Sequence, residues 1–164
     1  DDVFCFELNC DMNYWLMKNE PESFSIDDLQ RVQKEPWDGI RNYQVRNFIR
    51  DQMSIGDKAY FYHSSCKIPG IVGMMEICSE AYPDHTAWDP EQNYYDPKSN
   101  PENPIWLMVD VKFISKLDEP ITLQELRNHP ELENMRILQR GNRLSITPLD
   151  KNQWDYIQTL CVVS

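Results

Sequence analysis

Residues 35–47 gather two aromatic rings, three side-chain amides and two guanidinium groups: Trp37, Tyr43, Asn42, Gln44, Asn47, Arg41 and Arg46. The indole offers a flat face on which a base can stack, worth about 1–3 kcal/mol per base. The amides both donate and accept hydrogen bonds, as a base edge requires, and the guanidinium groups suit phosphates. A buried Trp, a helix-capping Asn and two solvated arginines would give the same pattern, so this stretch alone leaves both interpretations open.

Residues 62–66, YHSSC, place His63 beside two serines and a cysteine, a composition that raises the question of nucleophilic catalysis. Neighbours on a strand point to opposite faces and catalytic triads are assembled in space, so this adjacency is weak support. The sequence has neither a G-x-S-x-G elbow nor a glycine-rich phosphate loop. We therefore expect no catalytic pair at this stretch, and we expect these side chains to line a pocket or satisfy a turn.

Neither a metal nor a cofactor is predicted. The acidic residues of the proline-rich loop, Asp84, Asp89, Asp96 and Glu102, do not have the spacing of a twelve-residue calcium loop, and we expect them to be solvated. The five cysteines form no C-x-x-C pair and the three histidines lie far apart, so we expect free thiols rather than disulfides or zinc.

Composition indicates one folded domain. The 164 residues are 41% hydrophobic and include five Trp and eight Tyr, while the formal net charge is -11. No apolar run approaches the roughly 18 residues that span a bilayer, and the N-terminus does not resemble a secretory signal. We expect a soluble monomer, cytoplasmic in a bacterium or nuclear in a eukaryote. Residues 1–11 hold four acids and no base, and we predict an extension there, with the domain over 12–164.

Turn and capping signals predict the order of the elements. A strand should open at Met12 and end at Lys18, because YWLM is aromatic and apolar. Ser25 and Asp28 are spaced as a capping box for a helix over about 26–32, and Asn42 can cap a second helix that runs to about residue 53.

Further strands are expected over 59–63, 71–82, 106–117 and 143–149, with short helices after Thr122 and Asp150. The loop over 83–104 carries five prolines, and its aromatic residues favour ordered packing. Strands and helices do not alternate regularly, which excludes a doubly wound sheet. We predict an α+β fold: a curved or barrel-like mixed sheet of about five or six strands with short flanking helices.

Six ordered blocks resemble the EVE domain family, from about residue 13 to about residue 160: YWLMKNEPESFSIDDL, WDGIRNYQVRNFIR, IGDKAYFYHSS, GIVGMMEICSEAYPD, YYDPKSNPENPIWLMVDVKF and RGNRLSITPL. The resemblance implies a PUA-like curved β-barrel, related to the YTH and ASCH domains. Asn19 departs from the family's usual Ser, Ile40 from its Val, and Asn142 from its Ser.

The same resemblance implies a non-enzymatic reader of a modified nucleobase, with methylated or oxidised cytosine in DNA favoured and modified RNA left open. It assigns a base pocket to Trp15, Lys18, Asn19, Glu20, Trp37, Gly39, Arg41, Asn42, His63 and Ser64. It assigns a rim or phosphate role to Arg46, Arg143 and Ser145. The expected partner is nucleic acid, with no membrane and no metal.

Two other functions stay open. One is a protein-interaction module of a restriction or RNA-processing system, built on the aromatic loop over 82–106. The other is a modified-nucleoside enzyme that uses His63 with Ser64 or Cys66.

Overall fold

The computed structural model describes residues 12–164, and the predicted extension over 1–11 lies outside the described residues. The strands are β1 (Tyr14–Asn19), β2 (Lys34–Pro36), β3 (Lys58–His63), β4 (Gly70–Ile77), β5 (Tyr82–Pro83), β6 (Leu107–Met108), β7 (Asp110–Thr122) and β8 (Ile146–Leu149). The helices are α2 (Ile26–Val32), α3 (Tyr43–Asp51), α4 (Leu123–Arg127) and α5 (Lys151–Leu160), with short 3-10 helices η1 (His85–Trp88), η2 (Pro130–Leu132) and η3 (Arg136–Leu138). Over 12–164, no helix has the length and apolar character needed to cross a membrane.

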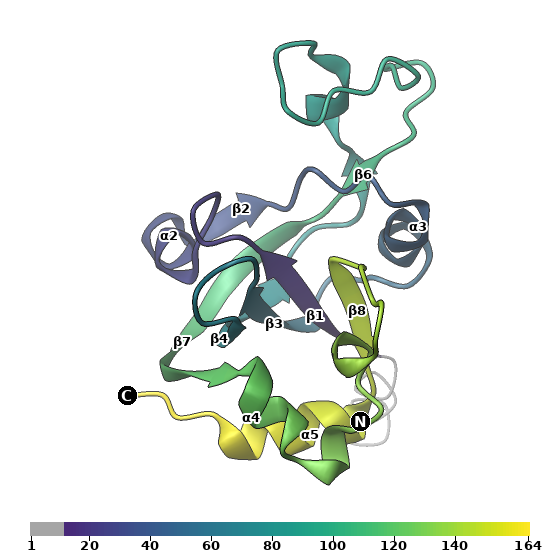
Figure 1. The fold of residues 1–164 in the computed structure, drawn as a ribbon. Coiled ribbons are helices and arrows are strands. Elements are labelled where there is room, and N and C mark those ends of the chain that lie inside the picture. Colours follow the sequence, from purple (N-terminus) through teal and green to yellow (C-terminus); the bar gives the residue numbers. More distant parts are fainter. Residues whose placement is uncertain (1–11) are drawn as a thin grey trace, which may run out of the picture.

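Six strands form one curled sheet in the order β2-β7-β4-β3-β1-β8, and β5 pairs separately with β6. Strand β1 runs parallel to β3, whereas the other pairings within the sheet are antiparallel. Figure 1 shows α2 at the left and α3 at the right of the sheet, with α4 and α5 below it. This arrangement confirms the predicted α+β fold with a curved mixed sheet and short flanking helices.

Local hydrogen bonds start the helices where the sequence predicts. Ser25 Oγ accepts from the Asp28 N–H and the Asp28 carboxylate accepts from the Ser25 N–H, so α2 begins where predicted. Its last residue, Val32, also agrees with the prediction. Asn42 caps α3 through its side-chain oxygen, and Asp150 forms a capping box with Gln153 at α5. Such caps satisfy backbone donors that would otherwise lack a partner, which is why they can be recognised from sequence alone.

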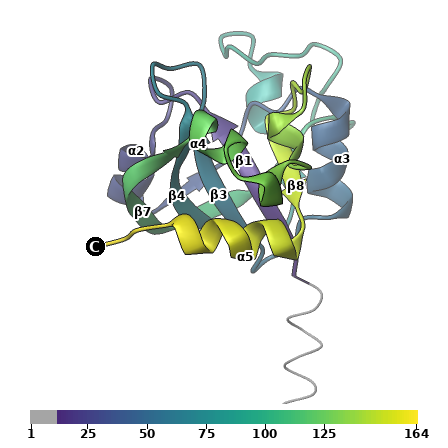
Figure 2. The ribbon, with the colours of Figure 1, turned by 60° about the horizontal axis from the view of Figure 1, so that its bottom comes forward.

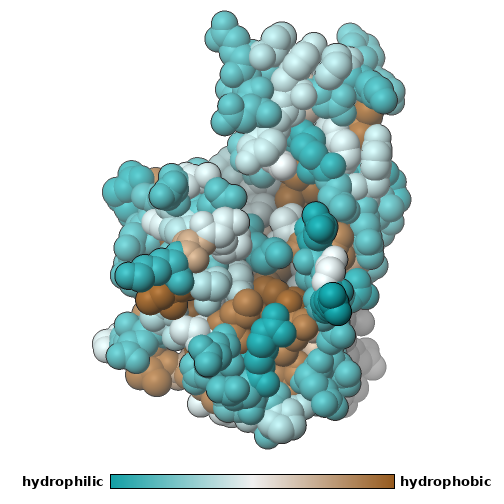
Figure 3. All heavy atoms as spheres, viewed as in Figure 1, coloured by the Kyte–Doolittle hydropathy of each residue, from teal (hydrophilic) through white to brown (hydrophobic). Residues whose placement is uncertain are grey.

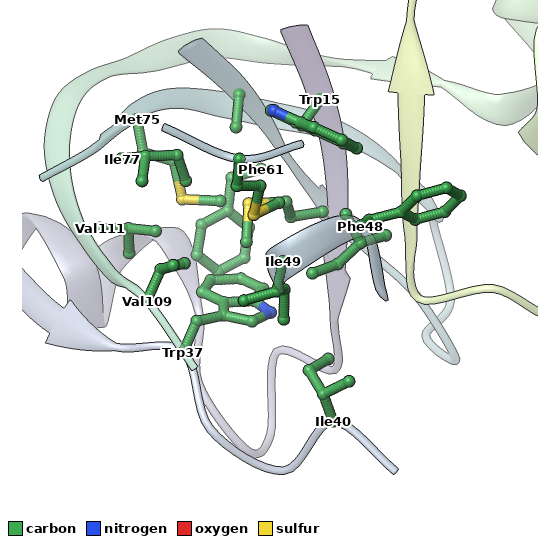
Figure 4. Packing of buried hydrophobic residues seen from close by; sticks show 14 of the residues in the cluster. Trp15, Trp37, Ile40, Phe48, Ile49, Phe61, Met75, Ile77, Val109 and Val111 are labelled. Atoms are coloured by element: carbon green, nitrogen blue, oxygen red, sulfur yellow. The ribbon is translucent and has the colours of Figure 1, made fainter. Parts of the chain in front are cut away.

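The sheet separates two apolar clusters. The first includes Trp15, Trp37 and Phe61 and is covered by α2 and α3 (Figure 4). The second includes Tyr60 and Trp154, whose ring centroids are 4.0 Å apart, and is covered by α5, which lies across the strands in Figure 2. The central residues of β1 are buried and contribute to both clusters, which confirms a strand buried on both faces.

The proline-rich loop between β5 and β6 projects from the body of the domain at the top of Figure 1. Its own side chains hold it: Trp106 Nε1–H donates to Asp96 at 2.7 Å, and Trp88 Nε1–H donates to Ser99 at 3.2 Å. The prediction of ordered packing is confirmed. The expectation that the acids of this loop are solvated is wrong for Asp84, which is fully buried.

Elements that depend on distant partners were predicted less well. The strand expected over 106–117 is two strands, β6 and a longer β7, and the strand expected over 143–149 begins only at Ile146. Strand β2 was not predicted, because the sequence Lys-Glu-Pro has no apolar pattern. It forms by pairing with β7, where Glu35 lies opposite Val111.

Candidate functional site

A cavity of about 250 Å³ opens where β1 and β3 both end. Because the two strands are parallel, their carboxyl ends meet at one edge of the sheet: Asn19 lies opposite His63, and the Ser64 N–H donates to the Asn19 carbonyl at 3.0 Å. On the other side of β1, the Lys18 N–H donates to the Ser145 carbonyl at 2.8 Å. Figure 3 shows a hollow near the centre of this face, among mainly hydrophilic side chains.

Three segments far apart in the sequence therefore meet at the cavity: the end of β1, the turn after β3 and the chain that leads into β8. A fourth, the segment after β2, closes another side. Eight of the residues predicted for the site line this cavity: Lys18, Asn19, Glu20, Trp37, Gly39, Ser64, Arg143 and Ser145.

Lys18 is the half-buried cation of the cavity. Burial lowers the pKa of its ammonium group, because desolvation disfavours the charged form. Among the described residues, no carboxylate lies within ion-pair distance of Lys18. Its ammonium group therefore has donors to offer to a bound molecule.

Two aromatic residues contribute to the cavity in different ways. Trp37 is only 4% exposed, and its ring packs edge-on against Phe61 with centroids 5.3 Å apart. Figure 4 places it at the border of the first core cluster, beside Ile49. Tyr94, from the proline-rich loop, is 49% exposed and lies against Gly39. Trp37 thus forms a fixed wall, and Tyr94 supplies the more accessible ring.

Arg41 joins the segment after Trp37 to the proline-rich loop. Its guanidinium lies 2.9 Å from the buried carboxylate of Asp84 and donates to the Tyr94 carbonyl at 2.8 Å and to Thr86 Oγ1 at 3.2 Å. Asp84 also accepts from the Gly39 N–H at 2.8 Å. Burial raises the pKa of Asp84, but hydrogen bonds from Thr86, Gly39 and Arg41 outweigh it and the pKa is lowered. Asp84 is therefore ionised at neutral pH. It fixes Gly39 directly, and it fixes the loop of Tyr94 through Arg41.

Five predicted site residues do not line the cavity: Trp15, Arg41, Asn42, His63 and Arg46. Trp15 is fully buried in the core, and its Nε1–H donates to the Asp57 carboxylate at 3.0 Å. Asn42 is occupied as the cap of α3, where it accepts from the Val45 N–H at 3.1 Å.

His63 and Arg46 also have structural contacts away from the cavity. His63 Nε2 accepts from the Ile26 N–H at 3.1 Å, so the ring proton of the neutral form is on Nδ1. Burial lowers the pKa of His63, which favours that neutral form. Arg46 donates to the Ile105 carbonyl at 3.1 Å and lies over the Tyr43 ring, 5.0 Å from its centroid.

Four lining residues were not predicted: Ser23, Asp38, Ile40 and Tyr94. Asp38 and Ile40 stand within the quoted WDGIRN block, so their proximity to Trp37 was a usable signal. Tyr94 opens another matching block, YYDPKSNPENPIWLMVDVKF, but that block lies far from Trp37 in sequence, and the position of its loop depends on the contact between Arg41 and Asp84.

The curled mixed sheet with a cavity at the shared end of β1 and β3 defines a PUA-like α+β domain. An ASCH protein from Zymomonas mobilis shares this fold alone, with a TM-score of 0.51 at 11% identity over 90% of this chain and 98% of that one. The chain belongs to the EVE domain family, whose model matches residues 13–160.

Relatives at higher identity extend this comparison. Rat thymocyte nuclear protein 1 is 46% identical over 90% of this chain and 73% of its own length. A Pseudomonas syringae protein of known structure is 47% identical with a TM-score of 0.87, covering 90% of this chain and 98% of that one. Human THYN1, crystallised with DNA that contains 5-methylcytosine, is 45% identical with a TM-score of 0.85, covering 90% of this chain and 96% of that one.

Proposed function

We propose that this chain binds nucleic acid and holds one modified base in the cavity, with methylated or oxidised cytosine in DNA as the first candidate. The observation that carries the proposal is the cavity itself. It combines the indole of Trp37, the exposed ring of Tyr94 and hydrogen-bonding groups at the ends of β1 and β3. Its volume of about 250 Å³ suits a single base and not a duplex.

Binding of this kind requires the base to leave its stack, at a cost of a few kcal/mol. The face of the base would be supported by Trp37 and Tyr94, and its edge would meet Lys18, Asn19 and Ser64. A buried methyl group contributes only about 0.8 kcal/mol, so a methyl alone gives a few-fold preference. A hydroxymethyl or other polar modification is selected more strongly where it pairs with a buried polar group.

The charge of the chain favours recognition of a base over recognition of a long backbone. A net charge of -11 repels a polyanion, so few phosphate contacts are expected. We expect a plot of log affinity against log salt with a slope no steeper than about -3, equivalent to roughly three neutralised phosphates. A measured slope near about -6 would contradict a pocket-driven mode of binding.

The crystal structure of human THYN1 with DNA that contains 5-methylcytosine supports that DNA as the first ligand to test. The decisive measurement is a binding screen of single- and double-stranded DNA and RNA that carry each common modified base, against the unmodified strands. Modified strands should bind more tightly. Equal affinity for modified and unmodified strands would contradict the proposal.

Variants of aromatic residues test whether the binding measured in this screen takes place at the cavity. Trp37→Ala tests the wall directly, but the residue is buried, so its folding must be verified by thermal unfolding. Tyr94→Ala removes a half-exposed ring and should lower affinity for the modified strand about fivefold or more, given the worth of stacking. Tyr95→Ala is the matched control, because Tyr95 is its neighbour, is 41% exposed and does not line the cavity.

The structure bears differently on the two alternative functions, a modified-nucleoside enzyme and a protein-interaction module. His63 makes no hydrogen bond to Ser64 or Cys66 within residues 12–164, since its Nε2 accepts from Ile26, and this weakens the catalytic hypothesis. Incubation with modified nucleosides should leave them unchanged. A protein-interaction role for the projecting loop is favoured only by its exposed Tyr95, and the Tyr95→Ala variant tests it: loss of a protein partner with base binding intact would support that role.

A further inference from the structure

The cavity contains a carboxylate that is not paired with any other residue of 12–164. Asp38 lines the cavity directly after Trp37, and no other residue within 12–164 donates a hydrogen bond to its side chain or forms an ion pair with it. The nearby cation, Arg41, is already bonded to Asp84, to the Ile40 carbonyl and to the Tyr94 carbonyl. The Gly39 N–H is likewise taken by Asp84.

Asp38 is exposed at the cavity wall, and its surroundings disfavour its negative charge. Burial raises its pKa, and the negative charge of Asp84 raises it further, with Arg41 only partly opposing them. A base bound in the cavity would displace water from this carboxylate, and a donor on the base would replace the hydrogen bonds lost with that water. The feature to explain is therefore which ligand group donates to Asp38.

The pyrimidines differ in what they present at position 4. Cytosine and 5-methylcytosine carry an amino group, which donates, whereas uracil and thymine carry a carbonyl oxygen, which accepts. A carboxylate accepts from the amino group and repels the carbonyl oxygen. Lys18 reaches the same cavity from β1 and can donate to the acceptors that all four bases have.

We propose that Asp38 determines specificity by accepting a hydrogen bond from the exocyclic amino group of the bound base, so that the cavity selects cytosine-type bases over uracil-type bases. This inference rests on the proposed binding of a base in the cavity. It separates two kinds of selectivity: Asp38 senses the edge of the base, and the methyl group is sensed by apolar contact elsewhere in the cavity.

Four single-stranded oligonucleotides test the inference. They are identical except for one central base, which is cytosine, 5-methylcytosine, uracil or thymine. At equal methylation the wild-type protein should bind the cytosine-type strand at least about tenfold more tightly. Asp38→Asn should bring this ratio close to one, because an amide can turn either its oxygen or its NH₂ toward the base. Asp38→Ala should also lower the ratio, because it removes both the hydrogen bond to the amino group and the repulsion of the carbonyl oxygen.

Glu22→Gln is the matched control, since Glu22 is an exposed carboxylate in the turn after β1 that does not line the cavity, and the tenfold ratio should survive that change. Thermal unfolding of each variant confirms that it is folded. Equal binding of 5-methylcytosine and thymine by the wild type, or an unchanged ratio in Asp38→Asn, overturns the role of Asp38. Equal binding of cytosine and 5-methylcytosine instead counts against recognition of the modification. Binding to none of the four strands would contradict both the role of Asp38 and the proposed binding of a base in the cavity.

Discussion

Gly39 lies so close beneath the ring of Tyr94 that a Cβ at position 39 would stand 2.8 Å from Tyr94 Cε2. The backbone of Gly39 also has φ +82°, a conformation that side chains with a Cβ rarely adopt. The absence of a side chain at position 39 therefore allows the proline-rich loop to close over one wall of the cavity.

Gly39→Ala should displace Tyr94 and lower affinity for the modified strand, besides costing about 1–2 kcal/mol of stability through the left-handed backbone. Gly141→Ala is the matched control, because Gly141 has φ +80° and nothing within 4 Å of its Cβ position. Urea unfolding of both variants measures the cost of backbone strain. Binding assays on the same variants measure the effect of displacing Tyr94. Similar losses of affinity in the two variants would contradict a specific role for the contact with Tyr94.

Asp84→Asn should destabilise the domain by about 3 kcal/mol, because it leaves the largely buried guanidinium of Arg41 without its countercharge. Affinity for the modified strand should fall as well, since Gly39 and Arg41 both lose a partner. Chemical unfolding at neutral pH gives the free energy, and Asp89→Asn, on the exposed part of the same loop, is the control. A loss below about 1 kcal/mol would show that the pair does not hold the loop.

His63 should make stability fall in mildly acidic solution. Burial lowers its pKa in the folded protein below the ordinary value of 6.5, so above about pH 6.5 its contribution to stability is complete, and that contribution is lost as the pH falls toward the folded pKa. Protonation would cost the hydrogen bond that Nε2 accepts from Ile26. His63→Gln should flatten the dependence of the unfolding free energy on pH below about 6.5. An equally steep pH dependence in His63→Gln would contradict this role of His63.

Arg143→Ala should reduce the salt slope of nucleic-acid binding by about one, if its exposed guanidinium neutralises one phosphate at the rim of the cavity. The loss of affinity should be the same for modified and plain strands, because a phosphate contact carries no base identity. Titrations at several salt concentrations measure the slope, and Arg50→Ala, an exposed arginine paired with Asp51, is the control. An unchanged slope with lost selectivity would assign Arg143 to the base instead.

The sequence predicted the elements whose signals are local. Ser25 with Asp28, Asn42, and Asp150 with Gln153 each satisfy backbone donors within three residues, so the starts of three helices follow from spacing alone. Strand β1 was predictable from its aromatic and apolar composition. Six matching blocks also indicated the family and placed Lys18, Asn19, Trp37 and Ser64 at the site, where they do line one cavity.

The tertiary structure decided which side chains of those blocks are free to meet a ligand. Trp15, Asn42 and His63 have residue types suited to a base pocket, but each is occupied by a partner that sequence spacing does not reveal. Tyr94 lies 55 positions after Gly39 and reaches the cavity because Arg41 bonds both Asp84 and the Tyr94 carbonyl. Contacts between distant segments decide whether a polar group is hydrogen-bonded within the protein or is free to bind a ligand. Only the folded chain establishes those contacts.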